Sequence, residues 1–195
     1  MACISNPVFT VGHSTRPLDE FLALLSESAI GCVVDVRRLP GSRRFPHYNA
    51  DALAHALATR NIDYWHLEAL CGRRTRRELE GAAPEGFWQN ASFARYAAYA
   101  RSSAFDKGLQ ELLDRASSQR CTLMCSEAVW WRCHRRIIAD HLLARGVQVL
   151  HILGRGHISA ATLTPGAIVR GTAVIYPPTA GGQPHAPHPE RKENP

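Results

Sequence analysis

The chain has 195 residues, 45% of them hydrophobic, so it is long enough to bury a full core as one domain. Its net charge of +6 comes almost entirely from arginine, because Lys107 and Lys192 are its only lysines. Arginine suits the recognition of phosphate or carboxylate groups, although an arginine-rich surface without a ligand has the same composition. No apolar run approaches the roughly 20 residues that a membrane-spanning helix needs.

The first residues and the cysteines both indicate a cytoplasmic protein. Residues 1–9 lack the basic start and the long apolar run of a signal peptide. Six cysteines in a chain without such a signal are expected to be reduced thiols. We therefore expect a cytoplasmic location.

The first half of the chain predicts three strands and two helices. In chain order, its elements are a strand at 8–12, a loop at 13–16, a helix from Pro17, a strand at 30–36, a loop at 39–49, a helix at 51–60 and a strand at 62–67. Pro17 suits the first turn of a helix. Asn49 or Asp51 is expected to cap the helix at 51–60.

The second half continues the alternation. In chain order, it predicts a polar, basic segment at 66–77, an irregular stretch at 78–89, a helix at 92–118 broken near 101–104, a strand at 121–125, a loop at 126–132, a helix at 133–145 and a strand at 147–152. Residues 157–165 predict a loop in which a short helix fits, and residues 174–176 an edge strand. The tail at 179–195 is rich in glycine, proline and histidine and is predicted to be disordered.

Strands that alternate with helices predict a single α/β domain over residues 1–178, with a mainly parallel sheet of about five strands and helices on both faces. Ligands bind outside the carboxyl ends of the strands in such sheets. Polar or reactive residues follow four of the predicted strands: His13, Ser14 and Arg16; Asp35, Arg37 and Arg38; His66 and Glu68; and Cys125, Glu127, Cys133, His134 and Arg135. This convergence predicts one shared site.

Cations crowd the start of the helix predicted at 133–145. Arg132, Arg135 and Arg136 lie beside a helix end that carries partial positive charge, so they repel one another unless negative charge is present. The candidates for that charge are the Glu127 carboxylate, a thiolate at Cys133 or Cys125, and a bound anion such as phosphate. The sequence therefore predicts an anion site here.

Four residues are candidates for the chemistry of this site. Glu127 would act as a general acid or base, and Cys133 as a nucleophile, because a helix start and arginines lower a thiol pKa. His13 would act as a base or an anion donor that Asp35 orients. Structural alternatives are a buried thiol at Cys133 or Cys125, an ion pair of Glu127 with Arg135 or Arg37, and an ion pair of Asp35 with Arg37 or Arg16.

Four sequence motifs resemble the domain-of-unknown-function 488 family (DUF488), over roughly residues 9–178. These are TVGHSTR, VVDVRRLPGSRRFPHYN, the LCGRR segment at 70–74 and MCSEAVWWRCHRRIIADHLLARG, while ILGRGH, LTP and YP are similar to one branch of the family. The resemblance implies a fold type and importance for Gly12, His13, Ser14, Arg16, Asp35, Arg37, Arg43, Asn49, Gly72, Cys125, Glu127, Cys133, His134 and Arg135. Cys71 stands where the family pattern has glycine, and Trp130 where many relatives have proline.

Three hypotheses for function remain open at this stage. The first is an enzyme that acts on a phosphorylated, nucleotide-like or nucleic-acid substrate held by Ser14, Arg16, Arg37, Arg43, Cys125, His134 and Arg135. The second is a nucleic-acid-binding module that uses the basic loops 37–48 and 73–77, whose aromatic residues would stack on bases. The third is a metal site of Cys125, Cys133 and His134, with Glu127 as a further candidate ligand, although neighbouring side chains on a helix diverge by about 100°. We favour the first; the sequence assigns no cofactor and no oligomeric state.

Overall fold

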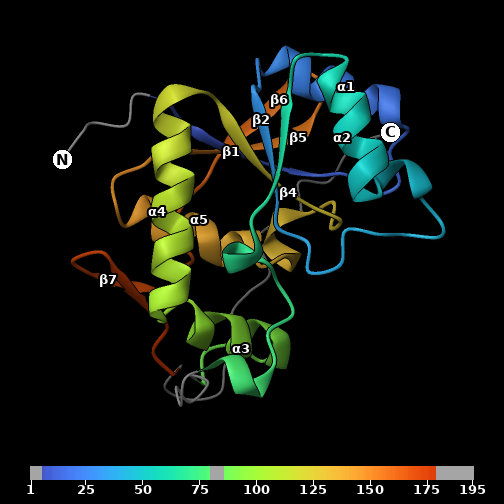
Figure 1. Cartoon of the computed structure of the whole chain (residues 1–195). Coiled ribbons are helices and arrows are strands. Elements are labelled where there is room, and N and C mark those ends of the chain that lie inside the picture. The colour runs from blue at the N-terminus through green and yellow to red at the C-terminus, as the bar shows by residue number, and fades with distance from the viewer. Residues whose placement is uncertain (1–5, 80–85, 179–195) are drawn as a thin grey trace, which may run out of the picture.

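The computed structural model describes residues 6–79 and 86–178, and its centre is one six-stranded sheet (Figure 1). The predicted tail at 179–195 and part of the irregular stretch at 78–89 lie outside the described residues. The strands are β1 (Val8–Gly12), β2 (Cys32–Asp35), β3 (Asp63–His66), β4 (Cys121–Cys125), β5 (Val149–Gly154) and β6 (His157–Ala160). They lie in the order β3-β2-β4-β1-β5-β6, and the first five run parallel.

The prediction of a loop at 157–165 is wrong for its first part. Residues His157–Ala160 form β6, which pairs antiparallel with β5 through a tight turn at Arg155 and Gly156. Gly156 has a φ of +63°, which favours glycine in such a turn. Most of β6 is exposed, so it lacks the apolar alternation by which a strand is recognised in sequence.

The edge strand predicted at 174–176 belongs to a separate small sheet. It is β8 (Ala173–Ile175), which pairs antiparallel with β7 (Ile168–Arg170). Between them, Gly171 takes a φ of +61°. This hairpin therefore adds no strand to the main sheet.

Within the described residues, five α-helices accompany the sheet, and two of them, α3 and α4, begin at a side-chain cap. They are α1 (Leu18–Glu27), α2 (Ala50–Ala58), α3 (Ala91–Tyr99), α4 (Ser103–Ser118) and α5 (Arg135–Leu143). Short 3₁₀ turns lie at Pro46–Tyr48, Glu68–Leu70, Arg76–Leu79 and Trp130–Arg132 (η1 to η4). The break predicted near 101–104 is present because the Ser102 hydroxyl accepts the backbone N–H of Phe105 and starts a new helix.

Asn49 stands at the start of α2, but its side chain does not cap that helix. Its Oδ1 instead accepts the backbone N–H of Ser42 at 2.6 Å. The amide therefore fixes the loop between β2 and α2, which is one wall of the site described below.

The helices lie on both faces of the sheet, as the alternation predicts (Figure 1). Alternate residues of the strands point to opposite faces. Val34 and Leu123 pack in the core shared with α3, α4 and α5. Val33 and Met124 pack in the core shared with α1 and α2. The fold is therefore an α/β sandwich of three layers. No helix within the described ranges is both long and apolar enough to cross a membrane.

The neighbouring strands β1 and β4 lead to opposite faces of the sheet. β1 continues into α1, whereas β4 continues through η4 into α5 on the other face. Such a divergence leaves a crevice outside the carboxyl ends of the two strands, where ligands bind in open α/β sheets. The topology therefore predicts a ligand-binding site at this edge of the sheet.

Candidate functional site

A cleft of about 620 Å³ lies at this crevice. Segments after β1, β2 and β4 supply most of its walls, and the first turn of α3 supplies another. The predicted site residues that line it are His13, Ser14, Arg37, Cys125, Glu127, Cys133 and His134. Residues that follow β1, β2 and β4 thus share one cleft, whereas His66 and Glu68, which end and follow β3, do not line it.

The cleft is strongly cationic. Among the described residues, its lining holds Arg37, Arg38, Arg73 and Arg132 but one carboxylate, that of Glu127. Arg73 and Arg132 are exposed, and their guanidinium groups make no ion pair within the described chain. Two arginines are therefore available to an anion that enters the cleft.

Arg37 is held rigidly by Asp35. Its Nε and Nη2 donate to the Asp35 carboxylate at 2.9 and 2.6 Å, and the Tyr64 hydroxyl donates to the same carboxylate at 2.7 Å. Asp35 is fully buried. It thus fixes Arg37 and does not touch His13, so it does not orient His13 directly as the sequence predicts.

His13 is neutral and has both ring nitrogens engaged. Its Nδ1 donates to the Ser14 carbonyl at 2.9 Å, and its Nε2 accepts from Arg37 Nη1 at 3.3 Å. Burial and the Arg37 charge lower the pKa of His13 to about 4. The ring also stacks on Tyr48 with centroids 4.0 Å apart. A neutral, hydrogen-bonded imidazole is poorly suited to donate to an anion or to act as a base.

Cys133 lies just before α5 and not within it. The prediction of a helix from 133 is wrong by two residues because η4 ends with a bond from the Cys133 amide to the Trp130 carbonyl. Cys133 is extended, with φ −124° and ψ 148°, and His134 is the N-cap of α5. Cys133 thus lines the cleft from two residues before the helix, with only 2% of its surface exposed.

Burial raises the pKa of the Cys133 thiol, but a hydrogen bond from Cys125 and the charge of Arg135 outweigh it and lower the pKa to about 6. Arg135 Nε donates to Cys133 Sγ at 3.3 Å. The same interaction with Cys133, together with burial, raises the pKa of Cys125 to about 12. At neutral pH the pair is therefore one thiolate, at Cys133, and one thiol, at Cys125.

This thiolate resolves much of the cationic crowding predicted at the helix start. Arg135 is buried and binds Cys133 Sγ and the Glu127 carbonyl. Arg136 turns away, where its Nε donates to Thr164 Oγ1 at 2.8 Å. Arg132 faces the cleft. The Glu127 carboxylate is exposed and makes no ion pair among the described residues.

Cys125, Cys133 and His134 also form the one group of potential metal ligands found in the described part of the chain. Their ligand atoms lie within 4.8 Å of one another, and Cys133 Sγ is 3.6 Å from His134 Nδ1. Because Cys133 precedes the helix, the divergence expected of helical neighbours does not apply. The set could hold a soft cation such as Zn²⁺. The Arg135 guanidinium opposes a dication, however, so we interpret the cluster as a thiolate–guanidinium pair.

Two glycines allow the walls of the cleft to come together. A Cβ at Gly12 would lie 1.9 Å from the Glu127 carbonyl oxygen. A Cβ at Gly72 would lie 2.7 Å from Nδ1 of His134. The resemblance singles out both positions, and the close contacts explain why a side chain does not fit.

Three predicted site arginines do not line the cleft: Arg16, Arg43 and Arg135, whose bonds to Cys133 and Glu127 are described above. Arg16 donates to the carbonyls of Gly12 and Leu153 and pairs with Glu20, so it supports the loop after β1. Arg43 is exposed and does not line the cleft. In the second basic run, Arg74 is buried and binds the carbonyls of residues 68, 69 and 71. Sequence alone does not separate these arginines from Arg73 and Arg132.

The start of α3 contributes residues that the sequence did not indicate. Asn90, Ser92, Phe93 and Tyr96 line the cleft. Tyr96 packs edge-on against His134, with ring centroids 4.8 Å apart, and its hydroxyl donates to the Leu70 carbonyl. Since α3 follows no strand directly, residues at its start could not be predicted from the ends of the strands. In the sequence, Asn90 is a candidate helix cap, which indicates where α3 begins but not that it lies at the site.

The fold and the cleft define an α/β protein with an arginine-lined site at the switch point of a parallel sheet. The chain belongs to the family described as Domain of unknown function DUF488, whose family model matches residues 17–142. The matched range contains Arg37 and the Cys125 to Arg135 segment and begins after His13. The resemblance stated from the motifs is thus confirmed. No curated protein and no solved structure matched the chain.

Proposed function

We propose that the protein is an enzyme that acts on a phosphorylated small molecule bound in this cleft. The observation that carries the proposal is that Arg73 and Arg132, which make no ion pair among the described residues, line the same cleft as Cys133 and Glu127. Guanidinium groups bind phosphate with two hydrogen bonds at once. An anion at this position would complete the charge balance of the cleft.

Glu127 and Cys133 are the proposed catalytic residues. Glu127 is exposed in the cleft and has no partner among the described residues, so it is available to move a proton. Cys133 is the proposed nucleophile, since a thiolate stabilised by Arg135 is more reactive than a thiol. Arg37 and His13 would shape the cleft beside them.

The first part of the test measures binding. Calorimetric titration with ribose 5-phosphate would compare the wild type with the double variant Arg73→Gln/Arg132→Gln. Each charge-assisted hydrogen bond contributes about 1.5–3 kcal/mol, so we expect at least a tenfold loss of affinity. The control is Arg60→Gln/Arg170→Gln, which removes the same charge from exposed positions outside the cleft. Equal affinity in both double variants would contradict the proposal.

The second part measures turnover. Wild-type protein is incubated with a panel of sugar phosphates and nucleotides, and consumption is followed by mass spectrometry. Glu127→Gln is expected to abolish turnover of any substrate found while leaving the melting temperature and the binding of that substrate unchanged. Full turnover in Glu127→Gln would remove Glu127 from the mechanism, and no consumption of any compound would count against an enzyme of this class.

A further inference from the structure

Three side chains between the end of β4 and the start of α5 bring soft ligand atoms close together. They are Cys125, Cys133 and His134, and all their ligand atoms lie within 4.8 Å of one another. Among the described residues, no carboxylate belongs to this group. Thiolate ligands without carboxylates favour soft metal ions over hard ones.

The distances fit a metal ion with three ligands. Metal–sulfur and metal–nitrogen bonds of about 2.3 and 2.0 Å, at an angle of about 120°, place sulfur and nitrogen about 3.7 Å apart. Cys133 Sγ lies 3.6 Å from His134 Nδ1. Two sulfurs in the same geometry lie about 4.0 Å apart. Because no separation in the cluster exceeds 4.8 Å, a side-chain movement of about 1 Å suffices to bind one ion.

Neighbouring groups hold the ligands in place. The His134 ring packs edge-on against Tyr96, with centroids 4.8 Å apart, and lies against Gly72, where a Cβ would come within 2.7 Å of Nδ1. Arg135 Nε donates to Cys133 Sγ at 3.3 Å. A hydrogen bond of this kind orients a ligand from the outer shell of a metal site. All three ligands line the cleft, which gives an ion a path to them.

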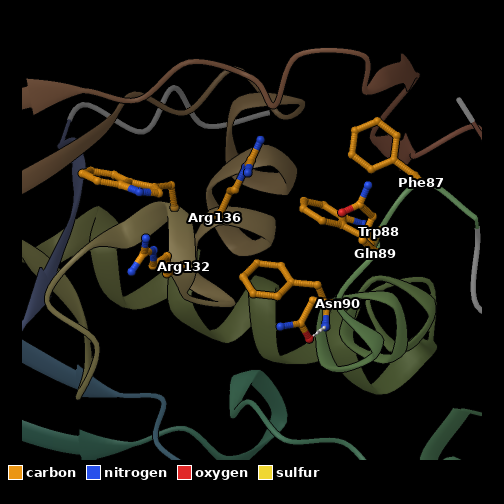
Figure 2. Close-up of a pocket in the computed structure, with 8 residues that line it drawn as sticks. Phe87, Trp88, Gln89, Asn90, Arg132 and Arg136 are labelled. Carbon is orange, nitrogen blue, oxygen red and sulfur yellow. Dashed lines mark hydrogen bonds between the residues drawn. The ribbon is translucent and has the colours of Figure 1, made fainter. Parts of the chain in front are cut away.

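Three arginines lie near the start of α5, and they differ in their relation to the cluster. Arg132 and Arg136 line an aromatic hollow of about 410 Å³ that residues 87–93 and 131–136 form (Figure 2). Arg132, which also lines the cleft, is exposed, so solvent screens its charge. Arg135 is buried and bonds to a cluster sulfur. Its charge is therefore the one that a metal ion at the cluster meets directly.

The Arg135 charge determines which metal ion the cluster suits. A cysteine binds metal as a thiolate, so a protonated Cys125 releases its proton to solvent on binding. Two thiolates, one guanidinium and a monovalent ion together carry no net charge. A divalent ion would leave one positive charge among buried groups, and a buried charge without a partner is costly. Arg135 therefore opposes Zn²⁺ but balances the bound state of Cu⁺.

We propose that Cys125, Cys133 and His134 form a binding site for Cu⁺, with Arg135 as the charge that favours this ion over Zn²⁺. The inference goes beyond the proposed function and needs no phosphate in the cleft. Metal binding and nucleophilic attack both use the Cys133 sulfur, so the metal-bound protein should not turn over a substrate.

The first test titrates the reduced wild-type protein in the absence of oxygen. Bathocuproine disulfonate competes for Cu⁺, and a zinc-binding dye competes for Zn²⁺. We expect one tightly bound Cu⁺ per chain and weaker binding of Zn²⁺. Outer-shell groups alone change metal affinity about 10–100-fold, so Cys125→Ser and Cys133→Ser, which each lose a ligand, should bind Cu⁺ at least about 100-fold more weakly. Cys71→Ser is the control, since Cys71 is also buried but lies outside the cluster.

The second test addresses the charge of the site. Arg135→Gln removes the guanidinium and should strengthen Zn²⁺ binding relative to Cu⁺ by about tenfold or more. Circular dichroism checks the fold of each variant; if Arg135→Gln does not fold, the comparison of the two ions in the wild type decides. X-ray absorption at the copper edge should show sulfur and nitrogen ligands, with fewer sulfurs in Cys125→Ser.

Three outcomes would overturn the inference. If Cu⁺ binding persists in both cysteine variants, other residues hold the ion. If Zn²⁺ binds the wild type as tightly as Cu⁺, the charge argument is wrong. If neither ion binds at one per chain, the cluster is a thiolate–guanidinium pair alone. Binding of ribose 5-phosphate is measured separately, so the proposed function does not fall with any of these results.

Discussion

At Cys133 two neighbours outweigh the effect of burial. A thiol removed from water ordinarily resists ionisation. Here Cys125 donates a hydrogen bond and Arg135 supplies a positive charge, with its Nε 3.3 Å from Sγ, and the pKa falls to about 6. Both neighbours come from the sequence motifs around β4 and α5. A single cysteine at this place without them would remain a thiol.

Alkylation of Cys133 should therefore follow a pH profile with a midpoint near 6, because only the thiolate reacts. Cys125→Ala removes the donated hydrogen bond and should raise the pKa and shift the midpoint to higher pH. The measurement is the rate of iodoacetamide labelling of each cysteine by mass spectrometry between pH 5 and 9. Cys71 is the internal control, since burial raises its pKa to about 12. A Cys133 midpoint near that of an ordinary thiol, or no shift in Cys125→Ala, would contradict this account.

The direction in which an arginine side chain points cannot be predicted from its position in the sequence. Arg16 and Arg135 both follow strands of the sheet, and both turn back to bind backbone carbonyls. Arg73, which the sequence marks only as part of a basic run, and Arg132, which it places beside the start of a helix, line the cleft. Whether a carbonyl lies within reach of an arginine depends on how loops pack, and that information is spread over the whole chain.

At the scale of elements, the cleft depends on a close contact between the end of β1 and the loop after β4. His13 and Ser14 donate backbone N–H groups to the carbonyls of Cys125 and Ser126. Gly12 then passes against the Glu127 carbonyl with no room for a side chain. The two segments thus continue the ladder of the sheet beyond its strands and hold Glu127 in place.

Gly12→Ala should accordingly destabilise the protein, because the new Cβ would meet a backbone oxygen that cannot move without the loop. Overpacking of this kind costs about 1–3 kcal/mol. The measurement is the free energy of unfolding in urea. Gly154→Ala is the matched control, since nothing lies within 4 Å of a Cβ at that position in β5. Equal stability of the two variants would show that the 126–128 loop adapts freely.

Helices and strands could be predicted from the sequence where an apolar pattern or a helix cap marks them. They could not be predicted correctly where a 3₁₀ turn precedes a helix or where a strand is exposed. Four of the five parallel strands are mostly buried and apolar, β3 lies between buried Ile62 and Leu67, and Ser102 marks the division of the long helical segment. The start of α5 was misplaced because η4 uses the residues between β4 and the helix. β6 was missed because an exposed strand carries little apolar pattern.

At the scale of the whole molecule, the site is a product of strand order. The sequence predicts parallel strands whose ends are polar, but not that β4 lies between β1 and β2. That order brings Cys125 beside Gly12 on one side of β4 and Met124 beside Asp35 on the other. The aromatic hollow likewise joins residues 87–93 to residues 131–136 through tertiary packing alone. Local patterns in the sequence cannot specify such contacts between distant segments.

The fold also buries two neutral histidines on separate elements. Burial and Arg37 lower the pKa of His13 to about 4, and burial and Arg145 lower the pKa of His141 in α5 to about 3. Neither ring nitrogen of His141 has a hydrogen-bond partner among the described residues. Both histidines are free to take up a proton near pH 6.5 only when the chain unfolds.

The stability of the protein should therefore fall as the pH decreases from about 6.5 to 4. In that window the unfolded chain binds protons at His13 and His141 that the folded chain does not, so protonation favours unfolding. Each histidine contributes a slope of up to about 1.4 kcal/mol per pH unit. His141→Leu removes one of the two groups without touching the cleft and should flatten the dependence measurably, as followed by urea unfolding between pH 4.5 and 7.5. His55→Gln, which removes an exposed histidine of α2, should leave the slope unchanged. If His141→Leu retains the wild-type slope, the side chain is already protonated or solvated in the folded protein, and the core around α5 is wetter than its packing indicates.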